Sequence, residues 1–421
     1  MKRIYTTLLL AAITLFACQT VSAYDFEVDG IFYNLNTSGM TVAVTHGDKK
    51  YTGDVVIPSS VTYNAKTLKV TQIGGYAFGG CTSLTSITIP SYVTTIGGYA
   101  FGGCTSLTSI TIPSYVTRIE YSTFSRCTSL ISVTIPNGVT TIEFDAFEGC
   151  TSLTSVTIPN SVTEIGREAF EGCTSLTSVT IPNSVTEIGG EAFKDCTSLS
   201  TVVLSENLTQ IYYNTFQGCS QLTSINIPAH VREIERSAFF LCENLEILIF
   251  EDSDQPLKIS KSIGDTEEAS HLHPTYLYLG REIKSGNESV YELMFPDKVE
   301  TLVFGKTYRS REHPAPATIK TVISKIEKPH EIEPFFNSTY ANAILYVPKG
   351  TKALYESTDG WKQFSNIQEG DPTTGIVSTK DDVDKVEVSR YDTKGQKLNV
   401  PRKGINIVRY SDGTTEKIVV R

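Results

Sequence analysis

The chain has 421 residues, 40% of them hydrophobic and 19% charged, a composition that is typical of a folded protein. Its formal net charge of −10 argues against nucleic-acid binding, because that function needs basic surface to displace counterions. The same charge gives no reason to expect attraction to anionic lipid. Length alone would favour two or three domains, but the internal repeats described below override that expectation.

Residues 1–23 have the layout of a signal peptide. Lys2 and Arg3 supply positive charge, and the apolar stretch 8–16 is too short to span a bilayer permanently. Val21-Ser22-Ala23 suits cleavage by a signal peptidase. We therefore expect export, and an extracellular or cell-surface location.

One alternative lies within the same segment. Leu15-Phe16-Ala17-Cys18 resembles a lipoprotein box, in which the chain is cleaved before a cysteine that is then lipidated. The bulky Phe16 and a strand pattern that begins almost directly after Tyr24 favour ordinary cleavage after residue 23. A lipid anchor at Cys18 is the single route by which we expect contact with a membrane.

Residues 24–72 predict an amino-terminal β cap. Asp29-Gly30 is a strong hairpin signal between the strand-like segments 26–28 and 31–33. Residues 41–45 alternate between apolar and polar, which predicts a further strand. The open end of a repeat array needs such a cap to cover its unpaired strand edge.

Residues 73–250 contain eight copies of a 23-residue repeat, in which cysteine, phenylalanine and leucine each recur at the same step. The cysteines are Cys81, Cys104, Cys127, Cys150, Cys173, Cys196, Cys219 and Cys242. The copies that begin at Cys150 and Cys173 differ at only a few positions. A fixed period of this kind predicts a stacked array rather than separate domains.

Each copy predicts one coil with a half-buried strand. Leu153, Val156 and Ile158 follow an L-x-x-L-x-L spacing, and the last two alternate with Ser155 and Thr157. This alternation is typical of a strand with one face in the core. The proline that follows ends the strand and turns the chain.

The rest of the coil reads as a short helical turn from Arg167 to Phe170, stopped by Gly172. A single coil cannot fold alone, because burying about six large apolar side chains gives only ~12 kcal/mol. Ordering its backbone costs at least ~20 kcal/mol. Stacking on neighbouring coils must supply the missing burial.

The repeat I-G-x-x-A-F-x-G-C-T-S-L-T-S-[IV]-T-I-P resembles the BspA-type leucine-rich repeats of bacterial secreted and surface proteins. The resemblance is close over residues 73–250 and continues in degenerate form to about residue 370. It implies a leucine-rich-repeat solenoid, a β-rich α/β repeat whose 23-residue coils form a curved parallel β-sheet between amino- and carboxy-terminal caps. It also implies adhesion to varied host or bacterial targets, without naming one.

Residues 251–370 predict degenerate repeats and a carboxy-terminal cap, with strands at 275–279, 299–304 and 344–347. Residues 371–385 predict a linker, which begins with Asp371-Pro372-Thr373-Thr374-Gly375.

Residues 386–421 predict a small β module with strands at 386–391, 405–410 and 416–420. This module resembles the carboxy-terminal sorting signals of type IX secretion substrates in Tyr391-Asp392 with Gly395, in Gly404 before a strand, and in Lys417 before the last apolar run. Ile405 stands where those signals usually carry an aromatic residue.

Stacked cysteines would lie ~4.8 Å apart, within the distance that a disulfide allows. Bridging would pull coils together in pairs and break a uniform stack. We therefore predict a column of buried free thiols that pack as small hydrophobes. No copy offers a second metal ligand at suitable spacing, and His271 and His273, beside Glu267 and Glu268, lack a further one.

The predicted binding surface is the outward face of the strands, together with two tyrosines in the turns that follow. Its members are Ser86, Thr88, Ser109, Thr111, Ser132, Thr134, Ser155, Thr157, Ser178, Thr180, Tyr92 and Tyr115. Tyr76, Tyr99, Tyr121 and Phe144 are further candidates, because exposed aromatic residues are favoured anchors at interfaces. The alternative is that the hydroxyl residues are merely soluble fillers of strands and that the aromatic residues pack between coils.

No nucleophile elbow, P-loop, dinucleotide-binding glycine motif or H-E-x-x-H zinc motif occurs in the sequence. We therefore predict a non-catalytic protein without a cofactor. Its predicted partners are host extracellular-matrix proteins, bacterial surface proteins or glycans, and not nucleic acid. The alternative is a structural protein of the cell envelope or biofilm that acts by assembly.

Overall fold

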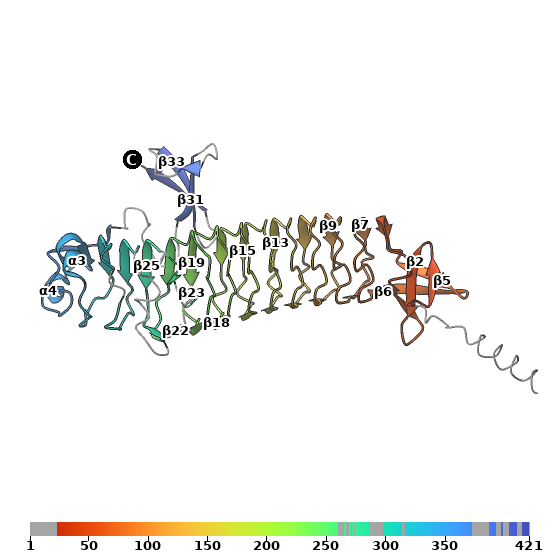
Figure 1. Ribbon diagram of the computed structural model, residues 1–421, viewed down its shortest axis with the longest axis horizontal. Coiled ribbons are helices and arrows are strands. Elements are labelled where there is room, and N and C mark those ends of the chain that lie inside the picture. Colours follow the sequence, from red (N-terminus) through yellow and green to blue (C-terminus); the bar gives the residue numbers. More distant parts are fainter. Residues whose placement is uncertain are drawn as a thin grey trace, which may run out of the picture.

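A computed structural model of the chain describes residues 23–259, 265–266, 269–270, 272, 274–285, 298–313, 316–372, 387–392, 397–398, 404–410 and 415–420. Its coils stack into a long rod with little bend in the view of Figure 1. Within the described residues, no helix is both long enough and apolar enough to cross a membrane. The predicted signal peptide up to residue 22, with Cys18, and the predicted His271 and His273 pair lie outside them.

The amino-terminal segment forms a small sheet at one end of the rod. Strands β1 (Phe26–Val28), β2 (Ile31–Leu35) and β3 (Thr41–Thr45) pair antiparallel, with the hairpin at Asp29-Gly30. The remaining strands of this segment are β4 (Gly53–Val56), β5 (Ser60–Tyr63) and β6 (Lys66–Ile73). Strand β6 pairs with β3 and, in parallel, with the first short strand of the array at Thr95–Ile96, so this sheet continues into the coils. Strand β4 belongs to a separate pair with the strand at Leu84–Thr88.

One row of parallel strands carries the L-x-x-L-x-L segments. These are β7 (Leu84–Thr88), β9 (Ser109–Thr111), β11 (Ser132–Thr134), β13 (Ser155–Thr157), β15 (Ser178–Thr180), β17 (Thr201–Val203), β19 (Ser224–Ile227) and β21 (Ile247–Phe250). Equivalent residues face each other, as Val133 does with Ile110 and Val156. The solenoid fold predicted from the repeat is confirmed.

A second row of short parallel strands follows the proline turns. It comprises β8 (Thr95–Ile96), β10 (Arg118–Ile119), β12 (Thr141–Ile142), β14 (Glu164–Ile165), β16 (Glu187–Ile188), β18 (Gln210–Ile211), β20 (Glu233–Ile234), β22 (Leu257–Ile259) and β26 (Ile283–Ser285). The isoleucines of this row are buried against the core. Between the rows, the repeated phenylalanines stack with ring centroids 5.2–5.7 Å apart.

The turn before each cysteine is not helical, so the prediction of a helical turn at 167–170 is wrong. Glu168 has a positive φ of 57°, which no helix accommodates. The Phe170 N–H donates to the Ala192 carbonyl of the next coil at 2.8 Å rather than within its own turn. In each of these turns, every second N–H thus donates a hydrogen bond to the next coil. Backbone hydrogen bonds therefore link the coils along a third side of the rod, in addition to the two rows of strands.

The carboxy-terminal coils are irregular. Strands β25 (Tyr276–Leu279), β27 (Thr301–Phe304), β28 (Thr321–Ser324), β29 (Ile344–Val347) and β30 (Asn366–Glu369) continue the sheet from β21. Helices α3 (Asn337–Asn342) and α4 (Lys352–Tyr355) lie at this end (Figure 1). Trp361 is fully buried there and donates its indole N–H to the His330 carbonyl.

Two further groups of strands complete the described residues. Strands β23 (Asp265–Thr266) and β24 (Ala269–Ser270) form a two-stranded antiparallel pair. Strands β31 (Glu387–Asp392), β32 (Lys397–Leu398), β33 (Gly404–Tyr410) and β34 (Thr415–Val420) form an antiparallel sheet. The three strands predicted after residue 385 correspond to β31, β33 and β34, while a sorting role stays a prediction.

Candidate functional site

The hydroxyl face consists of the outward side chains of β7, β9, β11, β13 and β15. All ten of the predicted Ser and Thr residues are exposed there. Ser132 lies beside Ser109 and Ser155 in the register of the sheet. Ser86 differs, because its hydroxyl donates to the Asp54 carboxylate of β4 at 2.6 Å. The amino-terminal cap therefore engages the first member of this face.

The same side of the sheet becomes apolar towards the carboxy-terminal coils. Ile249, Tyr278, Val303 and Ile323 pack together there and are 0–7% exposed. The outward side chains of the intervening strands, such as Thr201, Ser224 and Asn226, are half-buried, so the fully exposed hydroxyl face ends at β15.

Tyr92 and Tyr115 are exposed, by 62% and 60%, in the turns that follow β7 and β9. The Lys69 ammonium lies 6.0 Å from the centroid of the Tyr92 ring, within range of a cation–π contact. These tyrosines lie on the turns between the two strand rows and not on the strands of the hydroxyl face.

A row of aromatic side chains runs along the turns before the cysteines, which we call the turn face. The Tyr76 and Tyr99 rings lie 5.0 Å apart, and those of Tyr121 and Phe144 are stacked at 5.6 Å. Tyr76, Tyr121 and Phe144 are 40–52% exposed. The aromatic row, defined by these four residues, therefore spans four successive coils and faces water.

A polar depression of about 310 Å³, which we call the acidic hollow, adjoins the aromatic row at Tyr99. Its lining residues are Tyr99, Ser122, Ser125, Arg126, Asp145, Glu148, Glu168 and Glu171. Glu148 accepts a hydrogen bond from Ser125 at 2.6 Å and pairs with Arg126 at 3.4 Å. Burial, and then the neighbouring Glu168, raise the pKa of Asp145 to about 7.

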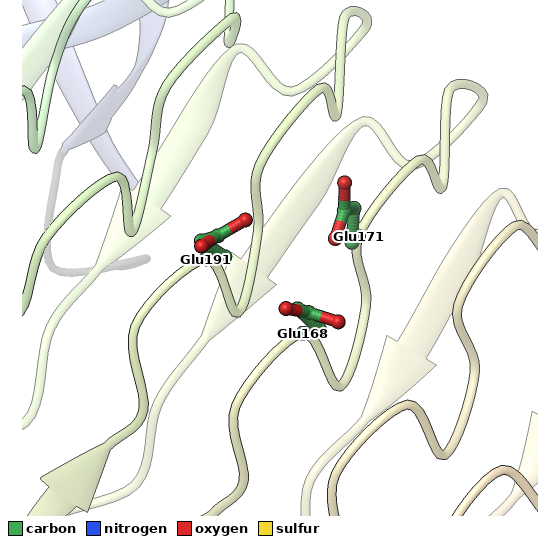
Figure 2. A group of neighbouring side chains, drawn as sticks. All are labelled: Glu168, Glu171 and Glu191. Carbon is green, nitrogen blue, oxygen red and sulfur yellow. The ribbon is translucent and has the colours of Figure 1, made fainter.

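Figure 2 shows Glu168 and Glu171 on one turn and Glu191 on the next coil, with carboxylate oxygens within 4.8 Å of one another. The Lys194 ammonium lies 2.8 Å from Glu171 and 3.0 Å from Glu191, and Arg167 pairs with Glu168. These side chains supply the positive charge that a metal ion would otherwise provide.

Sequence reasoning did not find the acidic hollow, although Asp145, Glu168 and Glu191 occupy the same repeat position at 23-residue steps. Aligning the variable positions of successive copies would have shown this acidic column. That alignment would not have shown that Tyr99 lines the acidic hollow, because this depends on how the coils stack.

The eight repeat cysteines are free and buried. The Cys150 thiol donates to the Phe124 carbonyl of the preceding coil at 3.1 Å, and equivalent bonds recur from Cys104 to Cys242. Burial raises the pKa of Cys150 to about 12. The column stabilises the coil interface and offers no reactive thiolate.

A family model described as a BspA type leucine rich repeat region, with six copies, matches residues 59–176 and 140–261. The chain belongs to the BspA-type leucine-rich-repeat family. The resemblance predicted from the repeat motif is confirmed. No curated protein matches this BspA-type chain in sequence.

Several solved structures are similar to the BspA-type chain. A leucine-rich repeat protein from Bacteroides ovatus is 25% identical, with a TM-score of 0.49, over 82% of this chain and 88% of that one. A leucine rich repeat protein from T. pallidum is 31% identical, with a TM-score of 0.38, over 52% and 90%. A leucine rich cell surface protein from Faecalibacterium prausnitzii is 24% identical, with a TM-score of 0.27, over 67% and 99%.

Proposed function

We propose that this BspA-type protein is an exported, non-catalytic adhesin that binds a basic segment of an extracellular or bacterial surface protein on its turn face. The observation that carries this proposal is the aromatic row beside the acidic hollow. The layout of residues 1–23 supports export and an extracellular or cell-surface location.

The aromatic row supplies apolar contact area at low entropic cost. A side chain such as Tyr121 or Phe144 has only two rotatable bonds, and stacking on its neighbour already restricts both. Rigid exposed aromatic side chains are favoured anchors in protein interfaces. Four of them in adjoining coils form a surface that an extended partner segment can follow.

The charge of the coils favours a basic partner. Residues 73–250 contain fifteen acidic and six basic residues, and four carboxylates line the acidic hollow. A Lys or Arg side chain entering this hollow meets carboxylates together with the Tyr99 ring, which combines charge pairing with a cation–π contact.

The test is a binding screen of purified residues 24–421 against extracellular-matrix proteins, bacterial surface proteins and glycan arrays. The turn-face variant combines Tyr76→Ala, Tyr121→Ala and Phe144→Ala. A second variant changes Ser132, Thr134, Ser155 and Thr157 to Glu on the hydroxyl face. A third combines Tyr92→Ala with Tyr115→Ala, which removes exposed aromatic rings of matched size elsewhere.

We expect saturable binding to a protein ligand that only the turn-face variant loses. Loss confined to the hydroxyl-face or Tyr92/Tyr115 variant would refute the assignment to the turn face. Saturable binding to glycans alone would refute the basic protein ligand. The absence of saturable binding by a folded protein would refute the adhesin function, and concentration-dependent self-association would then favour assembly.

A further inference from the structure

A second depression, of about 340 Å³, lies among the carboxy-terminal coils, and its charge is opposite to that of the acidic hollow. Its lining residues are Lys306, Arg309, Lys325, Ile326, Glu327 and Lys328. Four cationic side chains thus surround it with one carboxylate, on a chain whose formal net charge is −10. We call it the basic hollow.

Two neighbouring strands place these residues together. Strands β27 and β28 are parallel, with Phe304 opposite Ser324, so the loops that follow them leave the same edge of the sheet. The Lys325 N–H donates to the Phe304 carbonyl at 2.8 Å and holds the start of one loop against the end of the other strand. The charges of both loops therefore converge although about twenty residues separate them in sequence.

Arg309 is held in place by its own loop. One guanidinium nitrogen, Nη1, donates to the carbonyl oxygens of Lys306 at 2.9 Å and Tyr308 at 2.8 Å. Within the described residues, its Nη2 and Nε atoms have no such bond. These two N–H groups remain available as a planar fork, the geometry that recognises an anionic group with two oxygen atoms.

The lysines of the basic hollow differ in whether an acidic or aromatic side chain already interacts with their charge. Lys325 lies 5.2 Å from the Tyr278 ring centroid and 4.0 Å from the Asp371 carboxylate. Lys306 and Lys328 are exposed and form no ion pair with any acidic residue that the structure describes. Mutual repulsion among these cations is relieved when an anion enters, which favours binding of one.

The positive charge also continues along the rod. Strand β29 pairs with β28 in parallel, and the exposed Lys349 lies in the loop that follows it. Three successive coils, spaced ~4.8 Å apart, thus carry cations at the carboxyl ends of their strands. A row of this kind matches a ligand with repeated negative charges better than it matches a single small ion.

We propose that the basic hollow binds an anionic polysaccharide, with Arg309 holding one sulfate or carboxylate group and Lys306 and Lys328 contacting its neighbours. This site is separate from the turn face, and the proposal does not depend on the protein ligand inferred there. The shared chemistry is a glycan with regularly spaced negative groups, whether sulfate esters or uronate carboxylates.

The test measures affinity of the full chain from residue 24 for three probes at low and high NaCl. Heparin oligosaccharides carry sulfate and carboxylate groups, hyaluronan oligosaccharides carry carboxylates alone, and poly-glutamate is an acidic polypeptide. The site variant is Lys306→Gln with Lys328→Gln. The matched control is Lys284→Gln with Lys362→Gln, which removes the same charge from exposed lysines elsewhere.

We expect saturable binding to at least one of the two glycans, weakened by salt because the contacts are charged. The site variant should lose at least about tenfold in affinity and the control less than about twofold, since charge-assisted hydrogen bonds are strong. Arg309→Lys keeps the charge but removes the fork, and it should also weaken binding. Binding to heparin alone identifies sulfate as the recognised group, and binding to both glycans identifies the carboxylate as sufficient.

If the site variant and the control lost glycan affinity equally, the proposal would be overturned, because binding would then depend only on the net charge of the protein. Tighter binding of poly-glutamate than of either glycan would overturn the polysaccharide as ligand. If the folded chain bound neither glycan, the proposal would be overturned as well. The turn-face variant should retain glycan binding, which keeps the failure of one proposal distinguishable from failure of the other.

Discussion

The ring of Tyr121 lies directly over Gly98 of the preceding coil, so that a Cβ atom at Gly98 would lie 2.3 Å from the Cζ atom of that ring. The neighbouring Gly97 is restricted differently, because its Cβ atom would lie 2.5 Å from the backbone nitrogen of Gly75. Two adjacent glycines thus serve separate purposes. One makes room for an exposed aromatic ring, and the other lets two backbones approach.

This difference predicts opposite outcomes for two similar substitutions. Gly97→Ala forces backbone apart and should destabilise the fold by about 1–3 kcal/mol, as overpacking does. Gly98→Ala meets only a side chain that can swing into water, so its unfolding midpoint should change little. It should nevertheless weaken partner binding as much as Tyr121→Ala does. Denaturant unfolding and the binding assay check both, and a Gly98→Ala variant as unstable as Gly97→Ala would contradict the assignment.

Asp145 predicts a pH dependence of stability. Its pKa is raised from 3.8 in the unfolded chain to about 7 in the fold, by burial first and then by Glu168. The folded protein therefore binds this proton more tightly, and the stabilisation is complete below about pH 4 and is lost as the pH rises through about 7. Asp145→Asn should flatten this dependence and raise the unfolding temperature at neutral pH. Glu164→Gln, an exposed carboxylate on β14, is the control and should leave the pH dependence in place.

Arg281 predicts a sensitive point in the carboxy-terminal coils. It is fully buried, and its guanidinium donates to the carbonyl oxygens of Ile227, Pro228, Ala229 and Val231 at 2.6–3.2 Å. Arg281→Met removes four charge-assisted hydrogen bonds, each worth about 1.5–3 kcal/mol. The carbonyls of Ile227, Pro228 and Ala229 keep the bonds that they accept from Glu251, Val231 and Arg232, so the loss should be smaller than the sum. We expect a loss of at least about 3 kcal/mol in the free energy of unfolding.

The control for Arg281 is Lys284→Met, which changes an exposed residue three positions later, on strand β26. It should leave the unfolding midpoint nearly unchanged. Similar midpoints for the two variants would show that the guanidinium does not hold these carbonyls in solution.

The cysteine column predicts slow thiol chemistry. Burial raises the pKa of both Cys150 and Cys242 to about 12, so the reactive thiolate is scarce at about pH 8. In the folded chain from residue 24, the eight thiols should react with a disulfide reagent far more slowly than after unfolding in guanidinium. Rapid reaction of several thiols in the folded state would contradict their burial, and fewer than eight after unfolding would reveal disulfides.

The coils and their hydroxyl face could be predicted from the sequence, because alternation around residues such as Val156 reports which side of a strand is buried. The conformation of the turn at 167–170 could not be predicted. Its Phe170 N–H bonds to a neighbouring coil, and the sequence of a single repeat does not indicate that acceptor. Lys306 and Lys328 could not be brought together either. Their loops follow strands of irregular spacing, and only the observed register shows that both residues line one hollow.

The stacking geometry has a consequence for how such a protein changes over generations. The Gly149 N–H bonds to the Glu171 carbonyl, and the Gly172 N–H bonds in the same way to the Lys194 carbonyl. If residues 150–172 were deleted, the coils on either side of them would meet. They would pair through the same backbone hydrogen bonds that link other neighbouring coils of the rod. Loss or duplication of one repeat therefore alters reach by ~4.8 Å and leaves both ends intact. The rod can therefore lengthen or shorten by one coil at a time, and neither terminal segment has to change with it.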